Sequence, residues 1–374
     1  MQDTFQPQPP EPAPEAETPV SLTPPQLPPP QPIPAQPTPP AYRDRRTGLT
    51  IFGILQIILG LFAAMMIPLA MLGAFMARLG PGGGIHPRQL LPSMASYGSI
   101  AAIMITLGIG SIRIRRWARA LTLIGSWYWL IMGVLVTILL TAMLPVVMRT
   151  GLAQAQRQAG DAAAAPITTA VMAVVVTVII VMSAIFLIVV PIAFLVFYSR
   201  QDVEQTCRHR DPVERWTDRT PLPVLGASVV LFLGSLYMVL MGATTPLFPF
   251  FGRYLTGIPG AACFLVLAAI DFYLAIALFR LHASGWWAAV LLSPIRLVSM
   301  ALTYGRANLM DAYSRLGWSD AQLRMLNSNP MFRNHVILWW SLISLVIFFG
   351  YLLWIGRYFK TPGQASAVAD ARMI

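Results

Sequence analysis

The chain has 374 residues, of which 56% are hydrophobic and 11% are charged. A soluble globular domain carries about 25% charged residues, so this composition excludes an ordinary soluble protein and predicts one that lies in a bilayer. The formal net charge is +11, but the arginines gather at the ends of apolar runs, which favours anionic lipid headgroups over nucleic acid as their partner. Arginine outnumbers lysine 25 to 1, and with the abundant alanine and proline this indicates a GC-rich, bacterial coding bias.

The N-terminal segment, residues 1–42, holds half of the 32 prolines, four acidic residues and no basic residue. Such a segment buries too little apolar surface to offset its ordering entropy, so we expect a disordered cytoplasmic tail rich in polyproline conformation. It lacks a basic region followed by an apolar stretch, so it is not a secretory signal peptide. Two interpretations stay open: a solvated tail, or a strand that docks into an aromatic-lined groove on a cytoplasmic protein partner.

Eight apolar runs follow, each long enough to cross the ~30 Å hydrocarbon core of a bilayer. They are apolar on all sides rather than alternating, which excludes a membrane β-barrel and predicts an all-α polytopic helix bundle. Pro68, Pro145 and Pro191 lie inside the longer runs, where we expect kinks or helix ends. The runs cover residues 49–77, 95–113, 118–148, 167–199, 222–244, 260–281, 285–304 and 336–358.

Three short patterns recur in the same order in the two halves of the chain. An internal duplication explains them, with two parallel four-helix repeats at 43–200 and 222–358, a linker at 201–221 and a C-terminal tail at 359–374. The alternative is convergence, because Arg and Trp are ordinary anchors at membrane interfaces. The patterns are R-T-x-L-x-x-x-G at 46–53 and 219–226, L-x-I-x-x-x-R at 107–113 and 274–280, and W-A-x-x-L at 117–121 and 287–291.

The basic residues also predict an orientation. Sixteen of them flank the ends of the runs that face the two termini, and nine lie on the opposite side. Cytoplasmic loops carry the excess of Lys and Arg, so both termini are expected to face the cytoplasm from the cell membrane.

Two charged residues lie deep inside predicted helices. Asp271 and Arg296 stand about twelve residues before and after the turn at 282–285, which places both ~18 Å from the turn and near the bilayer midplane. Because an unpaired charge there costs ~2.5–3.5 kcal/mol, we expect the two side chains to pair. The pair either fixes the helix packing or forms a site for a proton, ion or polar headgroup, with Tyr273 and Tyr304 as candidate lining residues.

The aligned positions in the first half are Met104 and Ser126, so both charges are confined to the second half.

The glycine spacing indicates close helix packing. Residues 127–129, Trp-Tyr-Trp, predict packing against a neighbouring helix, with a lipid or quinone slot as the alternative. Residues 319–322, Ser-Asp-Ala-Gln, fit a helix-capping box and indicate a short surface helix or a simple connector. The glycines are Gly53, Gly60, Gly226, Gly234 and Gly242.

The sequence contains no P-loop, no H-E-x-x-H and no G-x-S-x-G motif. Cys207 and His209 lie close together but do not make a zinc site, and polar residues such as Gln56 are rare within the runs. We therefore expect no enzyme activity, metal or cofactor. The preferred function is a non-enzymatic membrane scaffold or assembly component, and the alternative is a transporter or permease with a midplane Asp/Arg site. The oligomeric state stays open.

Overall fold

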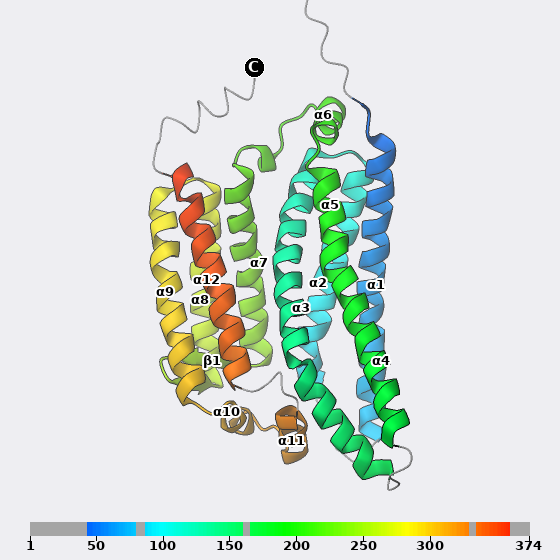
Figure 1. Ribbon diagram of the computed structural model, residues 1–374. Helices are drawn as coiled ribbons and strands as arrows, with labels where there is room; N and C mark the ends of the chain where they lie inside the picture. The colour runs from blue at the N-terminus through cyan, green and yellow to red at the C-terminus, as the bar shows by residue number, and fades with distance from the viewer. Residues whose placement is uncertain (1–42, 80–86, 160–164, 329–333, 360–374) are drawn as a thin grey trace, which may run out of the picture. The chain divides into compact units, whose positions relative to one another are not determined.

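Eight helices in the described part of the chain have the length and apolar composition to cross a membrane. The protein is therefore a multi-pass membrane protein built as an all-α bundle, as expected (Figure 1). The predicted N-terminal tail and, apart from Phe359, the predicted C-terminal tail lie outside the described residues. The computed structural model describes residues 43–79, 87–159, 165–328 and 334–359.

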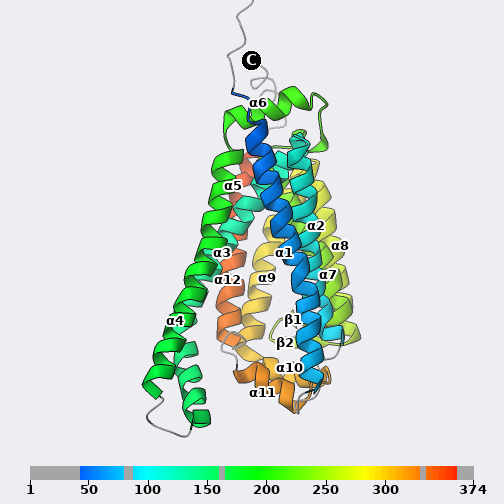
Figure 2. The same ribbon diagram turned by 90° about the vertical axis from the view of Figure 1, so that its right-hand side faces the viewer.

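The first four spans pack in chain order. The α1 helix lies along α2, α2 contacts α3, and α3 contacts both parts of the fourth span. We call these helices the first four-helix unit. The ends of α3 and α4 reach further than their neighbours on the side away from α6 (Figure 2). The elements are α1 (Arg46–Leu79), α2 (Pro87–Ile112), α3 (Arg116–Ala159), and a fourth span made of α4 (Ala165–Ala184), the π-helical η1 (Ile185–Val189) and α5 (Val190–Tyr198).

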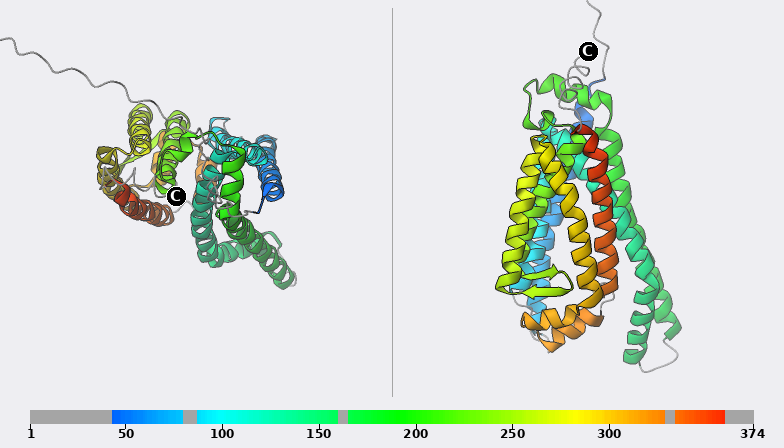
Figure 3. Two further views of the ribbon diagram at one scale, coloured as in Figure 1. Left: turned by 90° about the horizontal axis from the view of Figure 1, so that it is seen from above. Right: turned by 90° about the vertical axis from the view of Figure 1, so that its left-hand side faces the viewer.

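The other four spans form the second four-helix unit, with the same order of neighbours. The α7 helix lies along α8, α8 contacts α9, and α9 contacts α12. The two units meet where α7 contacts α2 and α3, and they lie side by side when seen along the helices (Figure 3). The elements are α7 (Leu222–Thr244), α8 (Ile258–Phe279), α9 (Ala283–Arg306) and α12 (Asn334–Ile355).

Shorter elements lie at the two ends of the spans. One end, called the α6 side, carries the connection between the units. The opposite end, called the hairpin side, carries a two-stranded antiparallel hairpin in which Leu247 pairs with Thr256, together with two short helices (Figure 1). The elements on the α6 side are α6 (Gln201–Arg210), η2 (Trp216–Asp218) and η4 (Gly356–Tyr358), and those on the hairpin side are β1 (Leu247–Phe250), β2 (Arg253–Thr256), α10 (Leu309–Arg315) and α11 (Asp320–Ser328).

The capping box ahead of α11 is formed by Ser319 and Gln322. The Ser319 backbone N–H donates to the Gln322 side-chain oxygen at 3.0 Å, and the Gln322 N–H donates to Ser319 Oγ at 3.4 Å. These two bonds satisfy backbone donors that the first turn of a helix leaves free. The interpretation of this segment as a short surface helix is confirmed over that of a simple connector.

Glycines allow α1 and α2 to approach closely. A Cβ added at Gly53 would lie 2.8 Å from the Gly108 carbonyl oxygen, and one at Gly60 would lie 3.1 Å from the Ala101 carbonyl oxygen. Any larger side chain would separate the two backbones, so the packing role expected for these two glycines is confirmed.

The α7 glycines do not share one face. A Cβ at Gly226 would meet the Tyr351 hydroxyl at 2.9 Å, and one at Gly242 would meet Phe264 at 3.0 Å, whereas Gly234 has no atom within 4 Å. The prediction of close packing is therefore wrong for Gly234. Steps of eight residues advance about 80° around a helix, so the three positions face different directions.

Pro191 accompanies a change of helix type in the fourth span. A proline lacks the N–H that would bond to the carbonyl four residues earlier, here that of Leu187. The backbone is π-helical over Ile185–Val189, just before this proline. Gly133 on α3 leaves room for the Leu187 carbonyl, since a Cβ there would clash with it. By contrast, α1 continues through Pro68 and α3 through Pro145, so neither proline ends its helix.

The α2–α3 and α8–α9 turns have the same backbone geometry. Each contains one non-glycine residue with positive φ, Ile114 at 55° and Leu281 at 57°. In each, the next N–H bonds to the carbonyl five residues back, Arg115 to Gly110 and His282 to Ala277, both at 2.9 Å. This is the hydrogen-bond pattern of a Schellman helix end.

The helix contact beside each turn also matches, with the two small residues exchanged. A Cβ on Gly110 would clash with Ala118 at 2.6 Å, and a Cβ on Gly285 would clash with Ala277. Each turn thus needs one glycine in a contact where a second Cβ does not fit. The glycine lies before the first turn and after the second.

Candidate functional site at the Asp271–Arg296 pair

The structure brings Asp271 on α8 and Arg296 on α9 into direct contact. The Arg296 guanidinium donates to the Asp271 carboxylate, and the two side chains are 18% and 4% exposed, respectively. The contact agrees with the equal depth inferred from the sequence, because α8 and α9 are antiparallel neighbours joined by a short turn. A carboxylate and a guanidinium in hydrogen-bond contact neutralise each other's charge. Whether the pair is also a binding site stays a prediction.

An apolar cluster fills the second unit between the pair and the α6 side. Asp271 lies on the buried face of α8, one turn from Leu274 and Ala275 of this cluster. The Trp286 indole N–H donates to the Leu352 carbonyl at 2.8 Å and fixes α9 against α12. The pair therefore lies at the edge of a closed apolar layer. The buried members are Val224, Ala227, Leu231, Leu274, Ala275, Leu278, Trp286, Ala289, Val290, Leu352 and Ile355.

Two buried serines lie on α7 and α9, the helices that pack against α8. Ser235 Oγ donates to the Phe232 carbonyl at 2.7 Å, and Ser293 Oγ donates to the Ala289 carbonyl at 2.8 Å. Both hydroxyls are thus satisfied within their own helices, and neither bridges to the ion pair. Arg296 Nε is buried and has no hydrogen-bond partner among the described residues.

The two tyrosines proposed as lining residues do not reach the pair. Tyr273 is 62% exposed, because two residues along a helix turn it about 200° away from Asp271. Tyr304 lies two turns beyond Arg296, where its ring packs against Tyr254 with centroids 6.0 Å apart. Tyr273 therefore points away from the pair, and Tyr304 lies beyond direct contact with it, so a lining role for Tyr304 stays a prediction.

The first unit holds a neutral hydrogen-bond network in its interior. Gln56 Nε2 donates to Thr122 Oγ1 at 3.0 Å, and Ser111 Oγ lies 3.4 Å from Gln56 Oε1 and 2.7 Å from the Tyr198 hydroxyl. All four side chains are buried, and they come from α1, α2, α3 and α5. Of these four residues, the sequence singled out only Gln56, because serine, threonine and tyrosine are common in membrane helices.

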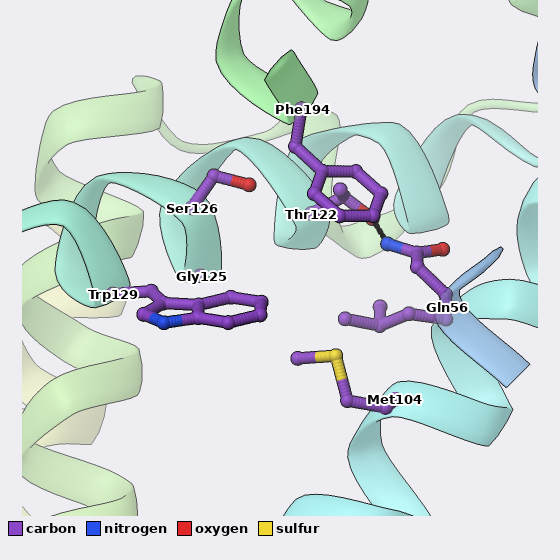
Figure 4. A pocket seen from close by; sticks show the side chains of 8 residues that line it. Gln56, Met104, Thr122, Gly125, Ser126, Trp129 and Phe194 are labelled. Carbon is purple, nitrogen blue, oxygen red and sulfur yellow. Dashed lines mark hydrogen bonds between the residues drawn. The ribbon is translucent and has the colours of Figure 1, made fainter. Parts of the chain in front are cut away.

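A small cavity adjoins this network (Figure 4). Its volume of about 10 Å³ is near the minimum for one water molecule. The lining residues are Gln56, Met104, Leu107, Thr122, Gly125, Ser126, Trp129 and Phe194.

Two of the lining residues occupy the positions that the ion pair has in the second unit. Counting from the matching turns, Met104 corresponds to Asp271 and Trp129 corresponds to Arg296. The alignment of Arg296 with Ser126 made from the sequence is therefore shifted by one turn.

The Trp-Tyr-Trp sequence on α3 is only partly in the core. Trp129 packs against Phe186 with ring centroids 5.2 Å apart. Trp127 and Tyr128 are 56% and 50% exposed, so the packing predicted for them is wrong. Consecutive helical residues point about 100° apart, and one neighbouring helix cannot contact all three.

The linker on the α6 side is packed rather than loosely solvated. Asp211 is almost fully buried and accepts from Arg115 at 3.3 Å and from Arg215 at 3.0 Å. Burial alone would raise the pKa of Asp211, but hydrogen bonds from the Arg215 side chain and the Arg116 backbone lower it overall. Further ion pairs join the linker to the spans, namely Arg45–Asp202, Arg119–Glu204 and Arg116–Asp218.

Cys207 belongs to the packed face of this linker. Burial raises the pKa of its thiol to about 11, so the thiolate is scarce at neutral pH. Among the described residues, no group of three His, Cys, Asp or Glu side chains could hold a metal ion. The geometry of Cys207 fits a packing role.

Comparisons with known proteins supply no further identification. No protein-family model matches the chain, and no curated protein or solved structure is significantly similar to it.

Proposed function

We propose that the protein is a non-enzymatic membrane scaffold or assembly component. The observation that carries this proposal is the Arg296–Asp271 contact, in which the two deeply placed charges are satisfied mainly by each other. In the first unit, Gln56, Ser111 and Tyr198 are likewise bonded to protein groups. Such closed contacts fix the helix packing, and they support a structural role for these groups over acid–base or nucleophilic chemistry.

We also infer that the two units arose from one duplicated four-helix repeat. The matching positive-φ residues Ile114 and Leu281, the exchanged glycine contacts, and the repeated order of helix neighbours support this. Of the three sequence patterns, the Trp pattern fits least well. Trp117 is the second residue of α3, whereas Trp287 is the fifth residue of α9.

The orientation belongs to the same proposal. The excess of basic residues on the α6 side supports a cytoplasmic location for that side and for both termini, in the cell membrane. Single cysteines introduced on the exposed face of α6 and on α11, probed with membrane-impermeant reagents in intact cells, test it. Labelling on α6 but not on α11 would contradict the proposed orientation.

The proline-rich N-terminal segment is the part proposed to recruit a protein partner. The experiment compares proteins captured from native membranes by the full chain, by a chain lacking residues 1–42, and by a chain whose prolines there are replaced with alanine. The alanine variant keeps the length and the charge of the segment. A partner lost from both variants supports the scaffold, and identical captures from all three chains would contradict recruitment by this segment.

A transporter is the second candidate, favoured by the buried Arg296 Nε, which has no partner among the described residues. Flux of protons or ions into dye-loaded proteoliposomes tests it, with Asp271→Asn as the matched variant. A flux that the wild type supports and the variant lacks would replace the scaffold proposal. Equal background rates for both proteins and for empty vesicles support the scaffold.

A further inference from the structure

Buried polar atoms that lack a partner are concentrated in the second unit. In the part of the chain that the structure describes, four such side-chain atoms occur, and three of them lie in this unit or on the hairpin that covers it. The three are Arg296 Nε, Ser344 Oγ and Tyr254 Oη, and the fourth is Thr217 Oγ1 in the linker.

Arg296 and Ser344 lie at the same depth on neighbouring helices. Trp286 on α9 contacts Leu352 through its hydrogen bond and also packs closely against Gly356 on α12. Because the helices are antiparallel, ten residues along α9 to Arg296 correspond to ten residues back along α12, near Ser344. Ser344 shares its helix face with Phe348 and Leu352, which pack into or against the apolar cluster. Its hydroxyl therefore faces the interior.

Polar side chains continue from this depth to the hairpin side. Ser341, one turn from Ser344, lies beside the Tyr304 hydroxyl. The Tyr304 ring packs against Tyr254, whose side chain is buried beneath the hairpin. Tyr304 and Tyr313 both pack against the buried cluster that contains Tyr254.

The path ends at the ion pair. Beyond Asp271 and Arg296, towards the α6 side, the interior is filled by the apolar cluster around Trp286 and Leu352. Among the described residues of this unit, the unpartnered side-chain atoms therefore lie at the pair or on its hairpin side. This geometry connects the pair with the hairpin side and separates it from the α6 side.

We propose that water occupies this half of the second unit and joins Arg296 Nε to Ser344 Oγ. The Arg296 Nε–H group is a donor only, so the molecule that bonds to it must offer an acceptor. A serine or tyrosine hydroxyl both donates and accepts, and water is the smallest molecule that satisfies all three unpartnered atoms. The water enters from the hairpin side past Tyr304. It does not form a path across the membrane, so the inference is independent of the scaffold proposal.

Hydroxyl-radical footprinting of the full chain in nanodiscs tests the hydration without any substitution. Radicals formed from internal water modify adjacent side chains, so Tyr304 should be modified at least five-fold faster than the lipid-facing tyrosines. Tyr273 and Tyr128, whose side chains are exposed on the outer surface of the spans α8 and α3, are the matched controls. Equal modification of all three tyrosines would overturn the proposal.

A cysteine series locates the end of the water-filled region. In a background with Cys207→Ala and Cys263→Ala, the variants Ser344→Cys, Ile343→Cys and Phe348→Cys are treated with a small, charged thiol reagent. We expect modification of Ser344→Cys alone, since position 343 faces lipid and position 348 lies in the apolar layer. Modification of position 348 as well would show a path through the unit, and no modification at position 344 would show a dry interior.

Each variant is first checked by its elution as a single species and by its melting temperature. If Ser344→Cys does not fold, Ser341→Cys replaces it, because position 341 lies one turn nearer the hairpin side on the same face. Rapid modification of position 341 supports entry of water from the hairpin side. Its resistance would overturn that route.

Discussion

Arg296 donates a hydrogen bond to Asp271 between two helices that are joined by a tight turn. The two residues meet because each lies about twelve residues from that turn. Equal depth on antiparallel helices makes such a contact geometrically simple. Substitutions at the pair therefore test the packing of α8 against α9 most directly.

Removing one member of the pair should destabilise the protein strongly. Asp271→Asn leaves the guanidinium without its counter-charge, and breaking a buried pair typically costs ~3–5 kcal/mol. The exchange of both residues, Asp271→Arg with Arg296→Asp, should restore more than half of the loss. Melting temperatures of the purified proteins in one detergent provide the measurement. Equally mild effects of the single and exchanged variants would contradict the pairing.

An apolar replacement of both partners separates a structural role from a functional one. Because well-packed apolar residues often replace a buried ion pair without loss, Asp271→Leu with Arg296→Met should keep the melting temperature within a few degrees. A stable double variant that still assembles with its partners indicates a structural pair. A stable double variant that loses activity or assembly would assign a function to the charges.

Gly133 should be intolerant of any side chain. Because a Cβ there would meet the Leu187 carbonyl, Gly133→Ala forces α3 away from the π-helical segment, at a typical overpacking cost of ~1–3 kcal/mol. Gly234→Ala is the matched control, since its Cβ would meet nothing within 4 Å. Thermal unfolding monitored by circular dichroism measures both. Equal stability of the two variants would contradict the close contact.

The sequence predicted the eight spans because length and hydropathy alone decide whether a helix can cross a bilayer. It also predicted the contact of Asp271 with Arg296, because both residues lie in one helical hairpin and depth could be counted from the turn. The same counting could not show that Tyr273 points away from the pair. Depth says nothing of the direction in which a side chain points around the helix.

Contacts between distant segments could not be predicted in this way. Ser299 and Thr303 on α9 accept hydrogen bonds from the hairpin N–H groups of Phe251 and Gly252, each at 3.1 Å. In the sequence these residues are ordinary hydroxyls in an apolar run, and residues 247–256 show no alternation of polar and apolar residues. Likewise, the π-helical segment before Pro191 depends on a glycine in another helix.

The neutral network of the first unit should contribute measurably to stability. Gln56→Leu removes the acceptor of Ser111 and the donor to Thr122, and leaving buried groups unsatisfied costs ~1–3 kcal/mol. Thr141→Val, at an exposed position whose hydroxyl bonds only to its own helix, is the control. Chemical unfolding of the two variants in mixed micelles measures the difference. A cost for Thr141→Val equal to that for Gln56→Leu would contradict the role of the network.

The packed linker should loosen in acid. The pKa of Asp211 is lowered in the folded protein, so the carboxylate contributes stability above the pKa of the unfolded chain, and that contribution is lost as pH falls through the lowered folded value. We therefore expect the linker to become sensitive to an acid protease below about pH 4, the ordinary range for aspartate. Asp211→Asn should be sensitive already at neutral pH, tested there with a neutral protease, whereas Glu214→Gln, at an exposed position, should behave as the wild type. Cleavage of Asp211→Asn with the pH profile of the wild type would show that another group controls the linker.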